Sequence, residues 1–445
     1  MWALRPFGPL YCAKARGKLK TSANNGYKKG FLMARDHFQR LILNDELHGR
    51  PALNLKSPGA VSHFAFIHAD AHQARRAIAN LCAIWQAPLP QDDAQFHRFE
   101  GQGLSAKWEL HGEFYTFTLA RADGANEAFT KPAAQTLPDN FLDELPGERL
   151  VAIHIAILNE AEDIRPQDYF GHEDLAGARV TDGLASLYTD FRIGPDGFSR
   201  AILHDHAIGP QRLARLLRRF LDIETYRMMA LLSFPVARAL QAPLSRLEKQ
   251  LTQMVAKQDH GDEKQLLSDL QSAHREIEEI SNTSSFRFAA ARAYAALVSK
   301  RIADLREERI PGIQRIGTFL ERRFSPAMST CEAAERRLNA LAQRFERVGN
   351  LMRTRVDIEL EAQNQGLLSS LEASSRRQLR LQQTVEGLSV VAISYYSLAI
   401  LGKLFEGAEA LHWITNPKLA EAIAAPFIIG IVWYLIRRLR AHLLQ

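Results

Sequence analysis

Three ionisable residues in segment 105–121 have the spacing of a metal-binding strand. Glu109, His111 and Glu113 lie two residues apart, and a β-strand places such alternating positions on one face. One imidazole and two carboxylates can bind a divalent metal. The ordinary half-buried strand with a polar solvent side is nevertheless favoured, because the ligands of an ion usually come from several elements. The opposite face of the strand would hold three apolar residues, Trp108, Leu110 and Phe114. The sequence does not identify a cofactor.

A second polar cluster lies near the start of the expected folded region. Its members are Asp45, Glu46, His48 and Arg50. Each of them can supply an acid, a base or a ligand. Polar clusters in loops more often cap helices and pair with neighbouring groups, so we expect a structural role.

The same interpretation applies to the sequence His204-Asp205-His206. The chain has no Gly-rich phosphate loop, no Gly-x-Ser-x-Gly elbow and no His-Glu-x-x-His motif. An enzyme would therefore need a deep pocket that gathers His48, Glu109 and His111 from separate elements.

A third set of polar residues lies in an apolar segment near the C-terminus. These residues recur at intervals of three and seven, which places them on one face of a helix: Glu386, Ser389, Tyr396 and Lys403. Such a face can line an ion pathway. It can also pack against a second helix, with Ser394, Ser397 and Gly430 allowing close approach, and we favour this packing.

The apolar segments are residues 387–402 and 422–436, runs of 16 and 15 residues without a formal charge. At about 1.5 Å per residue each covers roughly 22–24 Å, so each must recruit its flanks to cross a hydrocarbon core of about 30 Å. We expect a transmembrane hairpin rather than a hairpin buried in a soluble core. Arginines precede the first run and follow the second, at 376, 377 and 380 and at 437, 438 and 440. The positive-inside rule then places the N- and C-termini in the cytoplasm.

The net charge of +6 is concentrated at the N-terminus. Residues 1–30 hold seven Lys or Arg residues and no acidic residue, and the other 49 basic residues are balanced by 50 acidic ones. A neutral body gives no reason to expect nucleic acid as a partner. Residues 1–35 form either a disordered basic tail or a mis-annotated start that precedes Met33. The three cysteines form no Cys-x-x-Cys pair, which excludes a cysteine-rich zinc site.

The apolar pattern after this tail predicts an α+β protein in three parts. Residues 36–208 form a mixed α/β domain, 209–384 form long helices, and 385–445 form the two-helix anchor with a basic tail. In the first part we expect strands at 60–67 and 150–158, two strands or one long bent strand over 105–111 and 113–121, a helix at 70–86 and a hairpin over 187–203.

The helical body begins at Gly209-Pro210, a favourable start for a helix. A later helix, expected to begin at Ser325-Pro326, has no proline before the membrane and should run into it as one rod. It carries an apolar seam with strict three-four spacing, made of Cys331, Ala334, Leu338, Leu341, Phe345, Val348 and Met352. The seam can pack within one chain as an antiparallel bundle or between copies as a homo-oligomer, and its spacing does not decide between them.

Four strings resemble a family of bacterial membrane-anchored proteins, the DUF3422 family. They begin at Asn44, Lys107, Glu224 and Gln382: NDELHGRP, KWELHGEF, ETYRMMA and QQTVEGLS. The resemblance covers nearly the whole chain after residue 33 and implies a bacterial inner-membrane protein without a known activity. The architecture also resembles CorA-type divalent-cation channels, but Gly402-Lys403-Leu404-Phe405 stands where the Gly-Met-Asn signature would be expected.

Three classes of function remain from the sequence. In order of preference they are a membrane-anchored scaffold or interaction protein, a CorA-like oligomeric channel or transporter, and a membrane-tethered enzyme. The expected partners are the lipid bilayer and, for the oligomeric arrangements, further copies of the chain.

Overall fold

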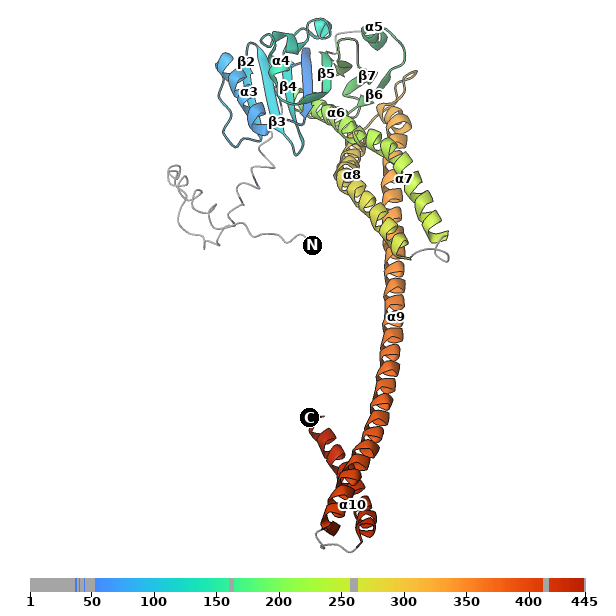
Figure 1. Ribbon diagram of the computed structural model, residues 1–445. Helices are drawn as coiled ribbons and strands as arrows, with labels where there is room; N and C mark the ends of the chain where they lie inside the picture. The colour runs from blue at the N-terminus through green and yellow to red at the C-terminus, as the bar shows by residue number, and fades with distance from the viewer. Residues whose placement is uncertain are drawn as a thin grey trace, which may run out of the picture. The chain divides into compact units, whose positions relative to one another are not determined.

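The computed structural model describes residues 37, 40, 44, 53–159, 164–256, 263–410 and 416–443. Its contacts divide the chain into two compact units that interleave along the sequence (Figure 1). The first, the sheet unit, comprises Met1–Phe234 and Ala289–Ser329. The second, the helical unit, comprises Pro235–Phe288 and Thr330–Gln445. This architecture confirms the predicted α+β class.

The sheet unit contains an eight-stranded sheet in the order β2-β3-β4-β1-β5-β8-β7-β6. Strands β5 and β8 pair in parallel, and the other neighbouring strands pair antiparallel. The strands are β1 Gly59–Ile67, β2 Phe96–Gly101, β3 Leu104–Leu110, β4 Phe114–Arg121, β5 Glu148–Leu158, β6 Ala176–Val180, β7 Ala185–Thr189 and β8 Ser199–Asp205. All the strands predicted from the sequence are present.

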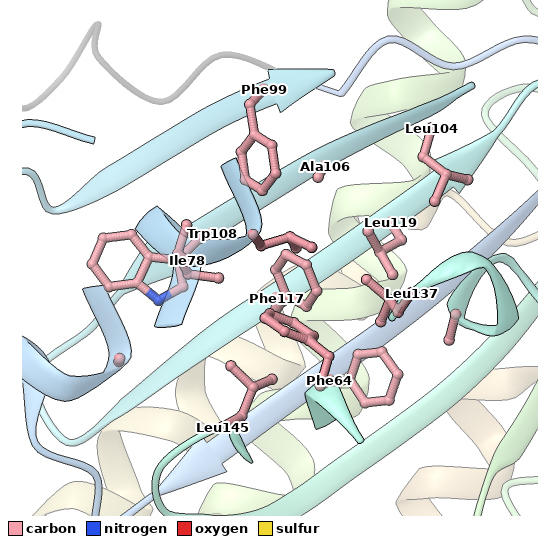
Figure 2. Close-up of a cluster of buried hydrophobic side chains, with 14 of the residues drawn as sticks. Phe64, Ile78, Phe99, Leu104, Ala106, Trp108, Phe117, Leu119, Leu137 and Leu145 are labelled. Atoms are coloured by element: carbon pink, nitrogen blue, oxygen red, sulfur yellow. The ribbon is translucent and has the colours of Figure 1, made fainter. Parts of the chain in front are cut away.

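One face of the sheet is covered by α3, Ala71–Ile84, which begins at Asp70 as predicted. The Asp70 carboxylate accepts hydrogen bonds from the backbone N–H groups of His72 and Gln73, at 2.7 and 3.0 Å. The short helices η2, Ala133–Thr136, and α4, Phe141–Glu144, complete this layer. Figure 2 shows the apolar core beneath it, in which Trp108 and Phe117 are fully buried.

The other face is covered by α6, Pro210–Leu231, which starts at the predicted Gly209-Pro210. Its residue Met229 packs with Ile67, Phe114 and Val151 of three strands. Tyr294, from the part of α8 that belongs to the sheet unit, joins this cluster. The sheet is therefore buried on both faces. The remaining short helices of this unit are η1, Ala125–Glu127, and α5, Pro166–Phe170.

The helical unit contains most of α7, Ser233–Ala256, the first part of α8, Glu263–Leu305, most of α9, Ile316–Ala410, and all of α10, Pro417–Leu443. The start of α7, the end of α8 and the start of α9 belong to the sheet unit. The predicted seam of α9 packs against α7 and α8 of the same chain. This core contains Leu244, Leu247, Leu251, Leu270, Ala273, Ile277, Leu338, Leu341, Phe345 and Met352. The seam is thus used for packing within one chain.

The predicted helix start at Ser325-Pro326 is wrong. Pro326 lies inside α9, which starts ten residues earlier at Ile316. A proline inside a helix leaves one carbonyl of the preceding turn without its donor. Around Pro326 this side of the helix is exposed, so that water can satisfy the free carbonyl.

After Met352 the helix α9 continues without interruption to Ala410, through Gly366 and Gly387. The predicted continuous rod is confirmed, and all residues from 357 to 385 are exposed. The C-terminal part of α9 and residues Pro417–Arg438 of α10 are long and apolar enough to cross a membrane. Only 6% of the most apolar window of each is buried, whereas a core helix of a soluble protein is mostly buried. Length and composition thus indicate membrane association.

Candidate functional site

The proposed metal ligands do not lie on one strand. Strand β3 ends at Leu110 and β4 begins at Phe114, so that His111 and Glu113 belong to the turn between them. The hydrogen bond from the His111 N–H to the Phe114 carbonyl, 2.8 Å, closes this turn. The turn at Gly112 resets the alternation, and Phe114 consequently lies on the sheet face opposite to Trp108.

The face of Glu109 is also not a solvent face, because α6 covers it. The Lys107 Nζ lies 2.9 Å from Glu109 Oε1, and the two side chains are only 6% and 13% exposed. Both residues are in β3 and two positions apart, which places them on the same face. Burial raises the pKa of Glu109, but the charge and hydrogen bond of Lys107, together with Arg218, outweigh burial and hold it below its usual value. Burial lowers the pKa of Lys107, and Glu109 partly offsets this effect.

His63 of β1 lies on the same buried face. Its Nδ1 is 2.8 Å from Thr118 Oγ1 of β4, and its Nε2 is 3.1 Å from Thr225 Oγ1 of α6. Burial lowers the pKa of His63 from 6.5 to about 3, and Glu109 only partly offsets the effect. The imidazole is therefore neutral, with one ring nitrogen donating to a hydroxyl and the other accepting.

Helix α6 contributes Arg218, Asp222 and Tyr226, which are spaced by four residues and so share one face. The Asp222 carboxylate accepts a hydrogen bond of 2.7 Å from Nε of Arg301, which lies in the part of α8 within the sheet unit. Burial raises the pKa of Asp222, and the charges of Arg301 and Arg218 partly offset this effect. Burial and the Asp222 charge raise the pKa of Tyr226 to about 12.

These groups line a small cavity of about 50 Å³, which we call the α6 chamber. Its ionisable lining is His63, Lys107, Glu109, His111, Arg218, Asp222 and Tyr226. A buried water molecule needs roughly 10–15 Å³ of such volume. The chamber can therefore hold a few water molecules or a small ion. Its alternating cations and carboxylates bind helix α6 to the sheet.

The α6 chamber brings together Glu109 and His111 with groups from β1, β4 and α6. His48, the third residue required for the expected enzyme pocket, lies outside the described residues, as do Asp45, Glu46 and Arg50. Among the residues that the structure describes, no group of three or more His, Cys, Asp or Glu side chains could hold a metal ion. A metal role for Glu109, His111 and Glu113 stays a prediction.

The residues of His204-Asp205-His206 bond to neighbouring groups. His204 Nε2 is 3.0 Å from the Asn159 carbonyl oxygen, and His206 Nε2 is 2.9 Å from Ser186 Oγ. The Asp205 carboxylate accepts a hydrogen bond of 2.8 Å from the Ile208 N–H. These contacts pair all three residues with neighbouring groups, and His204 and Asp205 belong to strand β8.

The polar residues of the first apolar helix do not all share one environment. Glu386 and Ser389 are half-buried, and the Ser389 hydroxyl donates to the Val385 carbonyl at 2.8 Å. Tyr396 and Lys403 are exposed, and Lys403 pairs with Glu406 at 3.2 Å.

Close approach of α10 to α9 occurs at Gly402, where a Cβ would lie 3.0 Å from Glu421 Oε1. Ser394, one of the residues expected at this contact, is 5% exposed. Gly430 has open space around it, so it does not serve the close contact that the sequence suggested.

Sequence reasoning missed the residues that complete the α6 chamber: His63, Lys107, Arg218, Asp222 and Tyr226. In the helix, the polar residues at 218, 222 and 226 could have indicated the chamber, because their spacing of four places them on one face of α6. In the strand, the residues at 107 and 109 could have indicated it, because their opposite charges lie on one face.

A model of one protein family matches residues 35–443 and carries the description "Protein of unknown function (DUF3422)". The chain belongs to the DUF3422 family. The predicted resemblance is therefore confirmed, and the match begins just after the basic segment. No curated protein and no solved structure matches the chain, and the likeness to CorA-type channels stays a prediction.

Two of the four strings on which the resemblance rests contribute residues to the α6 chamber. The string from Lys107 to Phe114 forms the hairpin of β3 and β4. In the string from Glu224 to Ala230, Thr225 bonds to His63, and Arg227 bonds to the buried Glu224 at 2.7 Å. Residues of two of the four strings thus take part in the packing of α6 on the sheet.

Proposed function

We propose that this DUF3422 protein is a membrane-anchored scaffold of the bacterial inner membrane, with the sheet unit and the bundle of α7, α8 and α9 on the cytoplasmic side. The observation that carries the proposal is the continuity of α9. One helix leaves the bundle core after Met352, stays exposed over residues 357–385 and enters an apolar span without a break. A helix of this kind can couple a folded body to a bilayer.

The charge distribution supports the same orientation. Arg376, Arg377 and Arg380 precede the apolar part of α9, and Arg437 and Arg438 follow that of α10. Basic residues next to spans favour the cytoplasmic side. The connection between the spans carries both signs of charge and gives no competing signal.

The size of the α6 chamber supports a scaffold over an enzyme. A volume of about 50 Å³ holds a few water molecules or a small ion, and the lowered pKa of Glu109 disfavours a role as a general base. The variant Glu109→Gln should therefore leave membrane insertion and the mass of the purified complex unchanged. If the wild-type protein has a measurable turnover and this variant loses it, the result would favour a membrane-tethered enzyme over a scaffold.

Anchoring and topology can be tested with single cysteines in a Cys12→Ser background, because Cys82 and Cys331 are buried. Full-length protein should stay in the membrane fraction after an alkaline carbonate wash. A membrane-impermeant maleimide should label Ala410→Cys in intact cells and should label Gln445→Cys only after lysis. Release by carbonate would refute the anchor, and the reversed labelling pattern would refute the orientation.

A further inference from the structure

The exposed part of α9 carries a second apolar seam, distinct from the seam inside the bundle. Its large residues are exposed by between 44% and 73% and repeat with heptad spacing: Leu360, Leu367, Leu371, Leu381, Val385 and Leu388. The small or polar residues Asn364, Ser374 and Gln378 occupy the remaining positions of the same three-four pattern. We call residues 360–388 of α9 the stalk seam.

The bundle of the same chain does not cover the stalk seam. Figure 1 shows α9 running on beyond the ends of α7 and α8. The seam of α9 that packs inside the bundle, which we call the bundle seam, runs from Cys331 to Met352. Its last buried residue, Met352, lies eight positions before Leu360. Val348 of the bundle seam and Leu360 hold equivalent positions of the three-four pattern, and at about 100° per residue their separation of twelve residues turns the apolar stripe by roughly 120° around the helix. The stalk seam therefore points away from the face that packs against α7 and α8.

We propose that residues 360–388 of two copies of this chain form a parallel, two-stranded coiled coil. A heptad repeat keeps its apolar face toward a partner helix with the same repeat, and a second copy supplies that helix. The parallel direction rests on the proposed membrane anchoring, because two chains anchored in one bilayer with the same topology present their stalks in the same direction.

The types of residue at the seam support two strands. In the heptad notation Leu occupies four of the five d positions, at 360, 367, 381 and 388. The four a positions hold Asn364, Leu371, Gln378 and the β-branched Val385. Leu at d with β-branched residues at a favours two strands, and an Asn at a fixes register and strand number.

The flanking charges are compatible with a parallel pair. In parallel coiled coils a g residue of one helix meets the e residue five positions later in its partner. These pairs are Gln363 with Leu368, Ser370 with Ser375, and Arg377 with Gln382. None of them brings like charges together.

Disulfide crosslinking in native membranes tests the register and direction. Full-length protein in the Cys12→Ser background would carry Leu360→Cys or Leu381→Cys, two d positions about 31 Å apart along the helix. An in-register parallel pair should give a crosslinked dimer at both positions under mild oxidation. The matched controls Ala362→Cys and Gln383→Cys lie two residues further, about 200° around the helix, and should lose most of the crosslink.

Crosslinking at one of the two d positions alone would refute the parallel register, and equal crosslinking in the controls would refute the seam. Native mass spectrometry of the detergent-solubilised protein should give a mass of two chains. The triple variant Leu367→Asp, Leu371→Asp and Leu381→Asp should shift it to one chain. These side chains are exposed in the single chain, so folding of the chain should be retained.

A complex of more than two copies, or of one copy with a different protein, would overturn the proposal. A failure of the proposed anchoring gives a different result. The protein would then leave the membrane fraction, and the crosslinks at the seam would still be measurable in the soluble fraction.

Discussion

Mild acid should destabilise the sheet unit through the buried imidazole of His63. In the folded protein its pKa is lowered from 6.5 to about 3. Between these two values the unfolded chain binds a proton that the folded protein does not bind. Stability therefore falls as the pH decreases below 6.5, until the folded pKa is reached.

The magnitude follows from the same two pKa values. Protonation of the unfolded imidazole costs the folded state about 1.4 kcal/mol for each pH unit below 6.5, which amounts to about 2 kcal/mol between pH 7 and pH 5. His154, whose pKa burial lowers to about 4, adds a similar loss. The raised pKa of Asp222 acts in the opposite direction. The contribution of His63 is thus best measured as a difference between variants.

The test is urea unfolding of the full-length protein in detergent at pH 7 and pH 5, followed by the emission of Trp85 and Trp108, which are both buried in the sheet unit. Between pH 7 and pH 5 the free energy of unfolding of His63→Gln should fall by about 2 kcal/mol less than that of the wild type. The variant should nevertheless be less stable than the wild type at neutral pH. The control His72→Gln changes an exposed histidine and should keep the wild-type loss. An equal loss in His63→Gln and wild type would refute the reasoning.

Two further predictions concern ion pairs. Lys107→Met should cost on the order of 3–5 kcal/mol of unfolding free energy, because it leaves the Glu109 carboxylate buried without its cation. The double variant Lys107→Met, Glu109→Leu should recover much of this loss. Equal stabilities of the two variants in urea would contradict the pairing. Arg337→Leu removes two hydrogen bonds to Glu248, at 2.7 and 2.6 Å, and should lower the free energy of unfolding by about 1 kcal/mol. The control Arg336→Leu removes only the exposed ion pair with Glu332 and should lower it by less than about 0.5 kcal/mol. A lower melting temperature for Arg336→Leu than for Arg337→Leu would contradict this order.

The elements of the sheet unit were predictable because their signals are local. Asp70 lies at a helix start, Gly209-Pro210 precedes α6, and alternating apolar residues mark the strands. The turn at Gly112 was harder to place, because the polar residues at 109, 111 and 113 keep a period of two through it. Only the pairing of β3 with β4 shows that the period ends there.

The α6 chamber could not be predicted, because it depends on contacts between distant segments. Thr225 is 162 positions from His63, and Arg301 is 79 positions from Asp222. A sequence pattern shows that a face is polar, but it does not show whether water or another element covers that face. The same limit applied to the bundle seam, whose partner within the chain became clear only from the packing of α7 and α8.

The polar face beneath α6 has a consequence for the chain during its synthesis. Strand β4 ends at Arg121, whereas α6 begins only at Pro210, so that the first strands leave the ribosome well before their covering helix. An apolar sheet face would be exposed to aggregation during this interval. Lys107, Glu109 and the hydroxyl of Thr118 can stay hydrated until α6 arrives. The charges that later bind α6 thus give this face of the nascent sheet groups that water can hydrate.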